Sequence, residues 1–186
     1  MSQTSTTTTL PTGTWALDVA HSHVGFTVRH LMVSKVRGTF QDFSADIVTA
    51  DDPLASSVSA TVQMGSIDTG DDGRDGHLRT NDFFDVEHFP TMTFRSTRIS
   101  GSGSEFEVTG DLTIKGVTRS VTFDLEVGGV QQDPWGNTKA GFTLTGSINR
   151  KDFGMEYNAV LESGGVLVGD KVTIEIDVEA ALQKES

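Results

Sequence analysis

Residues 74–84 bring together positive charge and aromatic rings. The segment contains Arg74, His77, Arg79, Phe83 and Phe84. The chain has 26 acidic against 14 basic residues, so these groups form a local reversal of charge. Because a guanidinium group makes paired hydrogen bonds to phosphate oxygens, we predict that Arg74, His77 and Arg79 bind an anionic group such as a pyrophosphate. A structural role also stays open, in which Asp75 caps a short helix and the two phenylalanines close a wall.

Two histidines and the single tyrosine are further candidate polar groups. His21 and His23 lie two residues apart, so on a strand they would share a face and could join a third ligand to hold zinc. A third ligand at metal-binding spacing is not visible in the sequence, and we predict no metal site. Tyr157 belongs to a glycine-flanked loop that either lines the mouth of a barrel or packs against it.

Composition and motifs argue against several classes of function. The formal net charge of −12 opposes binding to a phosphate backbone, so we exclude nucleic acid as a general partner. The chain has no cysteine, which excludes thiolate nucleophiles, thiolate zinc sites and disulfides. It also lacks G-x-S-x-G, P-loop and H-E-x-x-H motifs. We therefore predict that the protein is not an enzyme.

The elements that must position these groups are β-strands, because apolar and polar residues alternate along most of the chain. Such runs occupy residues 24–28, 58–64, 92–94, 106–114, 117–127, 142–148 and 172–178. With further runs near residue 15 and at 38–48, the pattern predicts about eight strands or more, a usual number for a small closed barrel. The only helix that the pattern indicates is a short one within the region Arg74–Phe84.

The apolar faces of these strands must bury against each other, because no long amphipathic helix is available to cover an open sheet. A sandwich and a closed barrel both satisfy this requirement. Several runs extend over about nine to eleven residues, whereas strands usually have about 5–6. This length favours the barrel.

Several motifs occur in order along the chain. They are Trp15-Ala16-Leu17-Asp18, residues 21–31, 34–40 and 74–85, Gly110 to Thr118, Ala140-Gly141-Phe142, and Ile148 to Gly154. Together they resemble the YceI family of bacterial lipid-binding proteins over about residues 13–180. The resemblance implies an all-β fold, a single antiparallel eight-stranded lipocalin-like β-barrel. It also implies an elongated tunnel that holds a polyisoprenoid chain or a related amphiphile.

We predict that the apolar phase of the strands lines this tunnel. The predicted lining residues are Val24, Phe26, Val28, Phe40, Val62, Met64, Phe94, Val108, Leu112, Phe123, Phe142 and Leu144. The predicted head-group or mouth residues are Arg74, His77, Arg79 and Tyr157. Small interior residues, among them Gly110 and Gly146, are expected to leave room for the guest. Burial of a lipid tail gives roughly 0.8 kcal/mol per CH₂ before entropy costs, so a long tail can bind without polar contacts.

The chain is expected to contain a disordered polar tail over residues 1–12, one barrel domain over 13–182, and a C-terminal tail over 183–186. Neither a secretory leader nor an apolar run of ~20 residues is visible, so we expect a cytoplasmic protein without stable membrane insertion. Many YceI family members are periplasmic. We expect a long-chain lipid as partner, a bound polyisoprenoid or related lipid in place of any cofactor, and leave a homodimer open.

Two other functions remain open from the sequence. The protein would be an enzyme if His77 or His30 acted as acid or base on an isoprenoid or quinone held in the tunnel. It would be an interaction protein if the barrel were filled by its own side chains and the loops bound a partner. A polar, titratable cluster inside the tunnel would favour the enzyme, and a solid interior would favour the interaction protein.

Overall fold

The computed structural model describes residues 9–162 and 164–184. The described part consists of one antiparallel sheet, four short 3₁₀ turns and one helix, α1 (Asp72–Leu78). The strands are β1 (Gly13–Leu17), β2 (His23–His30), β3 (Ser34–Phe40), β4 (Phe43–Thr49), β5 (Ser57–Gln63), β6 (Ile67–Asp68), β7 (Thr91–Ser102), β8 (Glu105–Ile114), β9 (Val117–Gln132), β10 (Thr138–Asn149) and β11 (Val168–Leu182).

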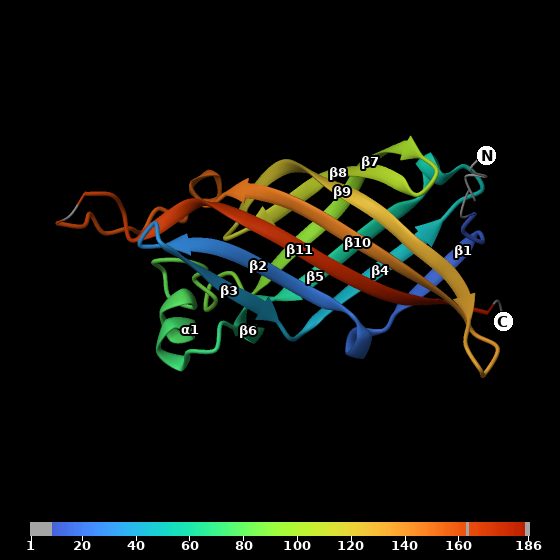
Figure 1. Cartoon of the computed structure of the whole chain (residues 1–186), viewed down its shortest axis with the longest axis horizontal. Helices are drawn as coiled ribbons and strands as arrows, with labels where there is room; N and C mark the ends of the chain where they lie inside the picture. The colour runs from blue at the N-terminus through green and yellow to red at the C-terminus, as the bar shows by residue number, and fades with distance from the viewer. Residues whose placement is uncertain (1–8, 163, 185–186) are drawn as a thin grey trace.

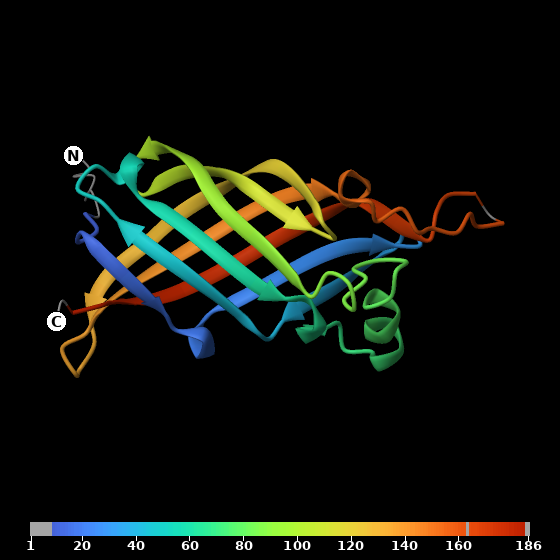
Figure 2. The same ribbon diagram turned by 180° about the vertical axis from the view of Figure 1, so that it is seen from behind.

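These segments make eight long strands, because three of the long strands are interrupted. The 3₁₀ turn Val19–His21 separates β1 from β2, a bend separates β3 from β4, and the 3₁₀ turn Met64–Ser66 separates β5 from β6. β11 pairs with β1 at one end and with β2 along the rest of its length, which closes the barrel. Figure 1 and Figure 2 show the resulting elongated barrel from two sides. The predicted all-β, eight-stranded antiparallel barrel is confirmed.

The two ends of the barrel differ. One end, called here the α1 end, carries α1, the turn between β2 and β3, and the loop 154–167 that precedes β11 (Figure 1). The other end, called here the terminal end, carries the start of β1 and the end of β11. Of the predicted N-terminal tail, residues 1–8 lie outside the described residues, but Leu10 packs against the apolar cluster around Trp15. The last residues before β1 therefore belong to the barrel. In the predicted C-terminal tail, residues 185–186 lie outside the described residues.

Helix α1 overlaps the region Arg74–Phe84, in which a short helix was expected, but it begins two residues before that region. Asp71 is the N-cap, since its side chain accepts a hydrogen bond from the Arg74 backbone N–H at 2.9 Å. The expectation that Asp75 caps the helix is wrong. Asp75 is buried, and it accepts a hydrogen bond from the backbone N–H of Thr69 at 2.9 Å, which ties α1 to the end of β6. Among the described residues, no helix combines the length and apolar character that crossing a membrane requires.

The interior glycines make room for the protein's own aromatic rings. A Cβ atom added to Gly110 would come within 2.5 Å of the Phe94 ring, and one added to Gly146 within 2.7 Å of the Phe123 ring. The rings therefore lie directly on the backbone of the neighbouring strand. The expectation that these glycines leave room for a guest is wrong, because Phe94 and Phe123 occupy that room.

Candidate ligand-binding cavity

Two cavities lie inside the barrel and adjoin each other. The larger one has a volume of about 520 Å³ and extends to the α1 end. The smaller one has a volume of about 200 Å³ and extends toward the terminal end. Val24, Met92 and Ile174 line both, so these three side chains mark the place where the cavities meet. A guest longer than the larger cavity would have to pass them.

The walls of the larger cavity are apolar over most of their area. Phe26 and Val28 come from β2, Phe40 comes from β3, and Val172 and Ile174 come from β11. Alternate residues of a strand point to the same face of the sheet, which is why this phase faces inward and Thr27 does not line either cavity.

All twelve residues predicted to line a tunnel face one cavity or the other. The larger cavity is lined by Val24, Phe26, Val28, Phe40 and Met64, and the smaller by Val24, Val62, Phe94, Val108, Leu112, Phe123, Phe142 and Leu144. Their place in the structure agrees with the alternation from which they were chosen. Their contact with a ligand stays a prediction.

Polar and charged side chains are concentrated at the α1 end of the larger cavity. They are Arg29, His30, Asp71, Arg74, His77, Arg150 and Tyr157. The group contains three guanidinium groups and one carboxylate, so it is positively charged although the whole chain carries −12. The two cavities together are therefore apolar along most of their length and polar and cationic at the α1 end.

Arg74 is held in place by the segment before its helix. Its Nε donates to Thr69 Oγ1 at 2.7 Å, and its Nη2 donates to the Thr69 carbonyl at 2.8 Å. These bonds use the Nε–H and one of the two N–H groups of Nη2, so Nη1 and the second N–H of Nη2 remain available to a guest. Thr69 alone thus fixes the direction of the guanidinium, through its hydroxyl and its carbonyl, before any ligand binds.

Three rings from two segments meet at the polar end of the larger cavity. His77 of α1 lies edge-on to Tyr157 with centroids 4.9 Å apart, and edge-on to Phe83 at 5.2 Å. Phe83 and Tyr157 are 5.3 Å apart. The His77 ring is oriented by Asp82, since Nε2 lies 2.8 Å from Asp82 Oδ2. This aromatic triad connects α1 to the loop 154–167 across the polar end of the cavity.

Arg79, predicted as a head-group residue, lies elsewhere. Its Nε donates to the Gly65 carbonyl at 3.2 Å and its Nη2 to the Ile67 carbonyl at 3.3 Å, and it does not line either cavity. The reason is its place at the C-cap of α1, five residues after Arg74, where the helix turns its side chain toward the turn before β6. Arg79 therefore attaches the helix to the barrel.

Arg150 is a cavity residue that the sequence reasoning missed. Only 2% of it is exposed, and its guanidinium donates to four backbone carbonyls, of Met155 at 2.7 Å, Tyr157 at 2.8 Å, Gly169 at 2.9 Å and Val168 at 3.3 Å. Burial lowers the pKa of Arg150, and the nearby Asp170 carboxylate partly offsets this. The position of an arginine directly after a strand does not predict that it is buried, because only the fold brings the carbonyls that it binds close to it.

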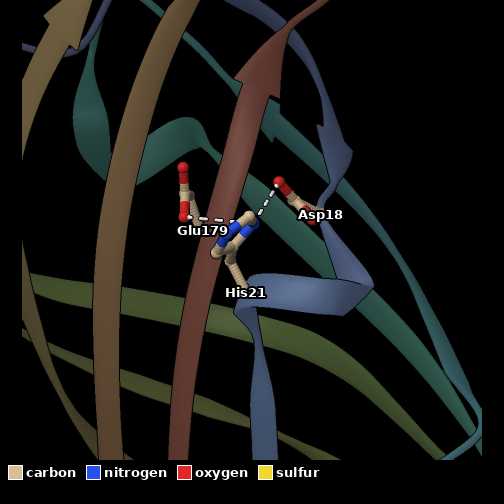
Figure 3. Close-up of side chains that lie close together, drawn as sticks. All are labelled: Asp18, His21 and Glu179. Atoms are coloured by element: carbon tan, nitrogen blue, oxygen red, sulfur yellow. Dashed lines mark hydrogen bonds and ion pairs between the residues drawn. The ribbon is translucent and has the colours of Figure 1, made fainter. Parts of the chain in front are cut away.

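A second polar cluster lies on the outside of the barrel, where β1 passes into β2 (Figure 3). His21 Nδ1 lies 2.9 Å from Asp18 Oδ2 and 3.9 Å from Glu179 Oε2. The hydrogen bond to Asp18 raises the pKa of His21, and the same bond lowers the pKa of Asp18.

These three side chains could in principle hold a metal ion, since their ligand atoms lie within 4.8 Å of one another. The Lys139 ammonium, however, lies 3.3 Å from Asp18 and 3.6 Å from Glu179 and already neutralises part of their negative charge. The sequence paired His21 with His23, whereas the structure pairs it with residues from the start and end of the chain. We interpret the cluster as an ion-pair network that links the 3₁₀ turn to β10 and β11.

Comparison with known proteins agrees with the fold. A family model for the YceI-like domain matches residues 15–180. A UPF0312 protein of Staphylococcus epidermidis is 42% identical over 167 residues, which cover 89% of this chain and 95% of that protein. A UPF0312 protein of Staphylococcus aureus is 40% identical over 172 residues, covering 91% of this chain and 98% of that protein.

Solved structures show the same barrel. Burkholderia cenocepacia BcnA superposes with a TM-score of 0.75 at 27% identity, over 88% of this chain and 98% of that one. The YCEI protein of Campylobacter jejuni superposes with a TM-score of 0.72 at 34% identity, and the match covers 90% of this chain and 97% of that one. A polyisoprenoid binding domain from Saccharophagus degradans has a TM-score of 0.67 at 16% identity, and the match covers 93% of this chain and 100% of that one. This domain therefore shares the fold. The barrel, its family model and its relatives agree, and the chain belongs to the YceI-like family.

Proposed function

We propose that the protein binds and carries a long-chain amphiphile inside its barrel, and that it does so without catalysing a reaction. The ligand class comprises polyisoprenoids, isoprenoid quinones and fatty-acid-like lipids. The observation that carries the proposal is the pair of adjoining cavities, about 520 and 200 Å³ in volume, with apolar walls and a cationic group at one end only. Small-molecule sites typically have volumes of about 300–1,000 Å³, and the larger cavity lies in this range.

The apolar walls of the larger cavity favour a lipid tail over water. A tail in this cavity would make van der Waals contacts with the walls and bury its own apolar surface, which stabilises the complex by roughly 25 cal/mol per Å² of apolar surface removed from water.

The polarity of the cavity suggests how the ligand is oriented. A tail would lie among Phe26, Val28 and Ile174 and continue toward the smaller cavity. A polar head would stay at the α1 end, beside Arg74, His77 and Tyr157. The remaining N–H groups of the Arg74 guanidinium favour a head group that accepts hydrogen bonds, such as a phosphate or a quinone carbonyl.

The neighbouring structures support the same ligand class. The Saccharophagus degradans domain is described as polyisoprenoid binding, and it has this fold. The two cavities also count against a solid barrel whose interior is filled by its own side chains. Catalysis by His30 or His77 is the competing function, because both histidines line the larger cavity.

Native mass spectrometry of the purified protein, followed by solvent extraction, tests the proposal. We expect a mass above that of the bare chain and an extracted amphiphile that is chemically unchanged after incubation with the protein. Protein freed of lipid should take up a prenol or a prenyl pyrophosphate. A bare-chain mass together with no uptake of isoprenoid or fatty ligands would overturn the proposal, and conversion of the bound lipid would favour the enzyme.

A further inference from the structure

The α1 end of the barrel exposes apolar side chains at the tip of the turn between β2 and β3. Met32 is 55% exposed and Val33 is 82% exposed, and Leu31 before them is also exposed. Leu31 and Met32 have φ angles of 56° and 60°, a left-handed conformation that is unfavourable for residues other than glycine, asparagine and aspartate. Polar turn residues would suit both the solvent and the backbone better. Within the described residues, the turn therefore presents apolar groups to solvent, Val33 most of all.

A second apolar tip lies beside the first. In the loop 154–167, Val160 is 86% exposed and forms an isolated β-bridge with Val166. The Leu31 backbone N–H donates to the Leu167 carbonyl at 2.9 Å, which joins the two tips. Figure 1 and Figure 2 show both segments at the α1 end, opposite the two termini, with the loop before β11 reaching further out than the β2–β3 turn. Val33 and Val160 are hereafter called the tip valines.

The two tips continue directly into the wall of the larger cavity. Arg29 and His30, just before the first tip, line its polar end, and so do Leu167 and Val168, just after the second. The base of the second tip is held by Asn158, which donates to the Val168 carbonyl at 2.8 Å and accepts from its N–H at 3.0 Å. The tips are thus built on a fixed frame at the rim of the cavity.

We infer that the tip valines, with Leu31 and Met32, insert into the surface of a lipid bilayer, so that the ligand passes between the bilayer and the cavity. This inference rests on the proposed lipid-carrying function. Arg29 and Lys35 form a cross-strand pair at the base of the first tip, where their positive charges would meet the phosphate layer of the lipids. A second copy of the chain fits less well, because a stable dimer buries about 800 Å² per partner, far more than these few side chains offer.

An exposed tryptophan at the opposite end offers an internal control. Trp135, in the turn between β9 and β10, is 81% exposed and follows Asp133 by two residues. The turn that carries it lies at the terminal end of the barrel, near the C-terminus and opposite α1 (Figure 1). If the terminal end docked instead, Trp135 would enter the lipid first.

The experiment measures partition of the lipid-free protein onto phosphatidylcholine vesicles by flotation. We expect the wild type to bind and Val33→Ser/Val160→Ser to lose about tenfold or more in partition coefficient, because two apolar side chains no longer enter the lipid. The matched control is Val19→Ser/Leu54→Ser, which removes two exposed apolar side chains away from the tips and should bind like the wild type. A Val33→Trp variant should show a blue-shifted emission on vesicles, whereas the wild-type emission, to which buried Trp15 and exposed Trp135 contribute, should not shift.

Uptake of a prenol from cyclodextrin separates this inference from the carrier function, since no vesicle is present. Loss of uptake by the wild type would count against the carrier function itself. Normal uptake together with equal vesicle partition of the wild type and Val33→Ser/Val160→Ser would overturn docking alone. A shift of the Trp135 emission would place docking at the terminal end and overturn the inference. The inference would also be overturned if the wild type dimerised with rising concentration and only Val33→Ser/Val160→Ser abolished this. The tips would then bind a second copy of the chain.

Discussion

Arg150 holds the backbone of Tyr157: its Nη1 donates to the Tyr157 carbonyl at 2.8 Å from a fully buried position. The same nitrogen donates to the Met155 carbonyl at 2.7 Å. One side chain at the end of β10 therefore sets the course of the loop that brings Tyr157 to His77 and Phe83. The polar end of the cavity thus depends in part on a residue that was not selected from the sequence.

Replacement of Arg150 by methionine should destabilise the protein and loosen the cavity mouth. Four backbone carbonyls would each lose a hydrogen bond from the guanidinium, and we expect a fall of about 2–4 kcal/mol in the free energy of unfolding. Urea denaturation measures the change. Lys151→Met is the matched control, because Lys151 is the next residue and is exposed. Equal stability of the two variants would contradict the clamping role.

Charge placed on the inner face of a strand should be far more harmful than charge on the outer face. Phe26→Asp and Val62→Asp would each bring an unpaired carboxylate into an apolar cavity, and we expect losses of several kcal/mol or failure to fold. Thr27→Asp and Thr61→Asp lie one residue away on the outer face and should stay within about 1 kcal/mol of wild type. Thermal melts and prenol uptake compare the two pairs. Similar behaviour of both pairs would mean that the faces are assigned the wrong way round.

Arg74→Ala should lower the affinity for an anionic ligand and leave the affinity for a neutral one nearly unchanged. A hydrogen bond to a charged group contributes about 1.5–3 kcal/mol, which corresponds to about ten- to a hundredfold in affinity. Calorimetric titration with a prenyl pyrophosphate and with the matching prenol checks this, and the prenol should bind nearly as before. Arg79→Ala is the comparison variant, since its guanidinium binds backbone carbonyls outside the cavity. It should lower stability without changing the preference between the two ligands, and the opposite result would restore Arg79 as a head-group residue.

Gly110→Ala and Gly76→Ala should change stability in opposite directions. A Cβ atom at Gly110 would collide with the Arg95 carbonyl oxygen and come within 2.5 Å of the Phe94 ring, so we expect a loss of about 1–3 kcal/mol. A Cβ atom at Gly76 meets nothing within 4 Å, and alanine favours the helix by about 0.5–1 kcal/mol. Denaturation midpoints measure both. A neutral Gly110→Ala would show that the Phe94 ring moves away freely.

The contribution of the external ion-pair network should depend on pH. The pKa of His21 is raised, so its contribution to stability is full below the ordinary histidine pKa of about 6.5 and is lost as pH rises through the higher folded value. The pKa of Asp18 is lowered, so its contribution is full above about 3.9 and is lost as pH falls through the lower folded value. The network therefore contributes fully between these two limits.

His21→Ala should accordingly lower the melting temperature more at pH 5.5 than at pH 8.5. His23→Ala, two residues away and outside the network, serves as the control and should show no such difference. A pH-independent effect of His21→Ala would mean that the His21–Asp18 contact does not involve charge.

The sequence by itself determined where the strands lie, which alternate residues of each strand face the interior, and the family. Alternation of apolar and polar residues is a local property of each strand, and a closed sheet can bury only one face of each strand inside it. For this reason all twelve predicted lining residues face a cavity. The turns and the short helix were also readable, because Gly, Pro and Asp act on the backbone within a few residues. The motifs that resemble the YceI family extended over nearly the whole barrel, as the family model confirms.

Only the tertiary structure decided how the interior is filled and what the polar groups contact. Whether Gly110 admits a guest or the Phe94 ring depends on the neighbouring strand, which no local pattern specifies. Arg74 and Arg79 look equivalent in the sequence, yet the helix directs one to the cavity and the other to backbone carbonyls. Arg150 carries no local signal of burial, and Asp18, His21 and Glu179 meet only because β11 closes the barrel against the first strands. These outcomes depend on packing between segments distant in the chain, which residue type and spacing leave undetermined.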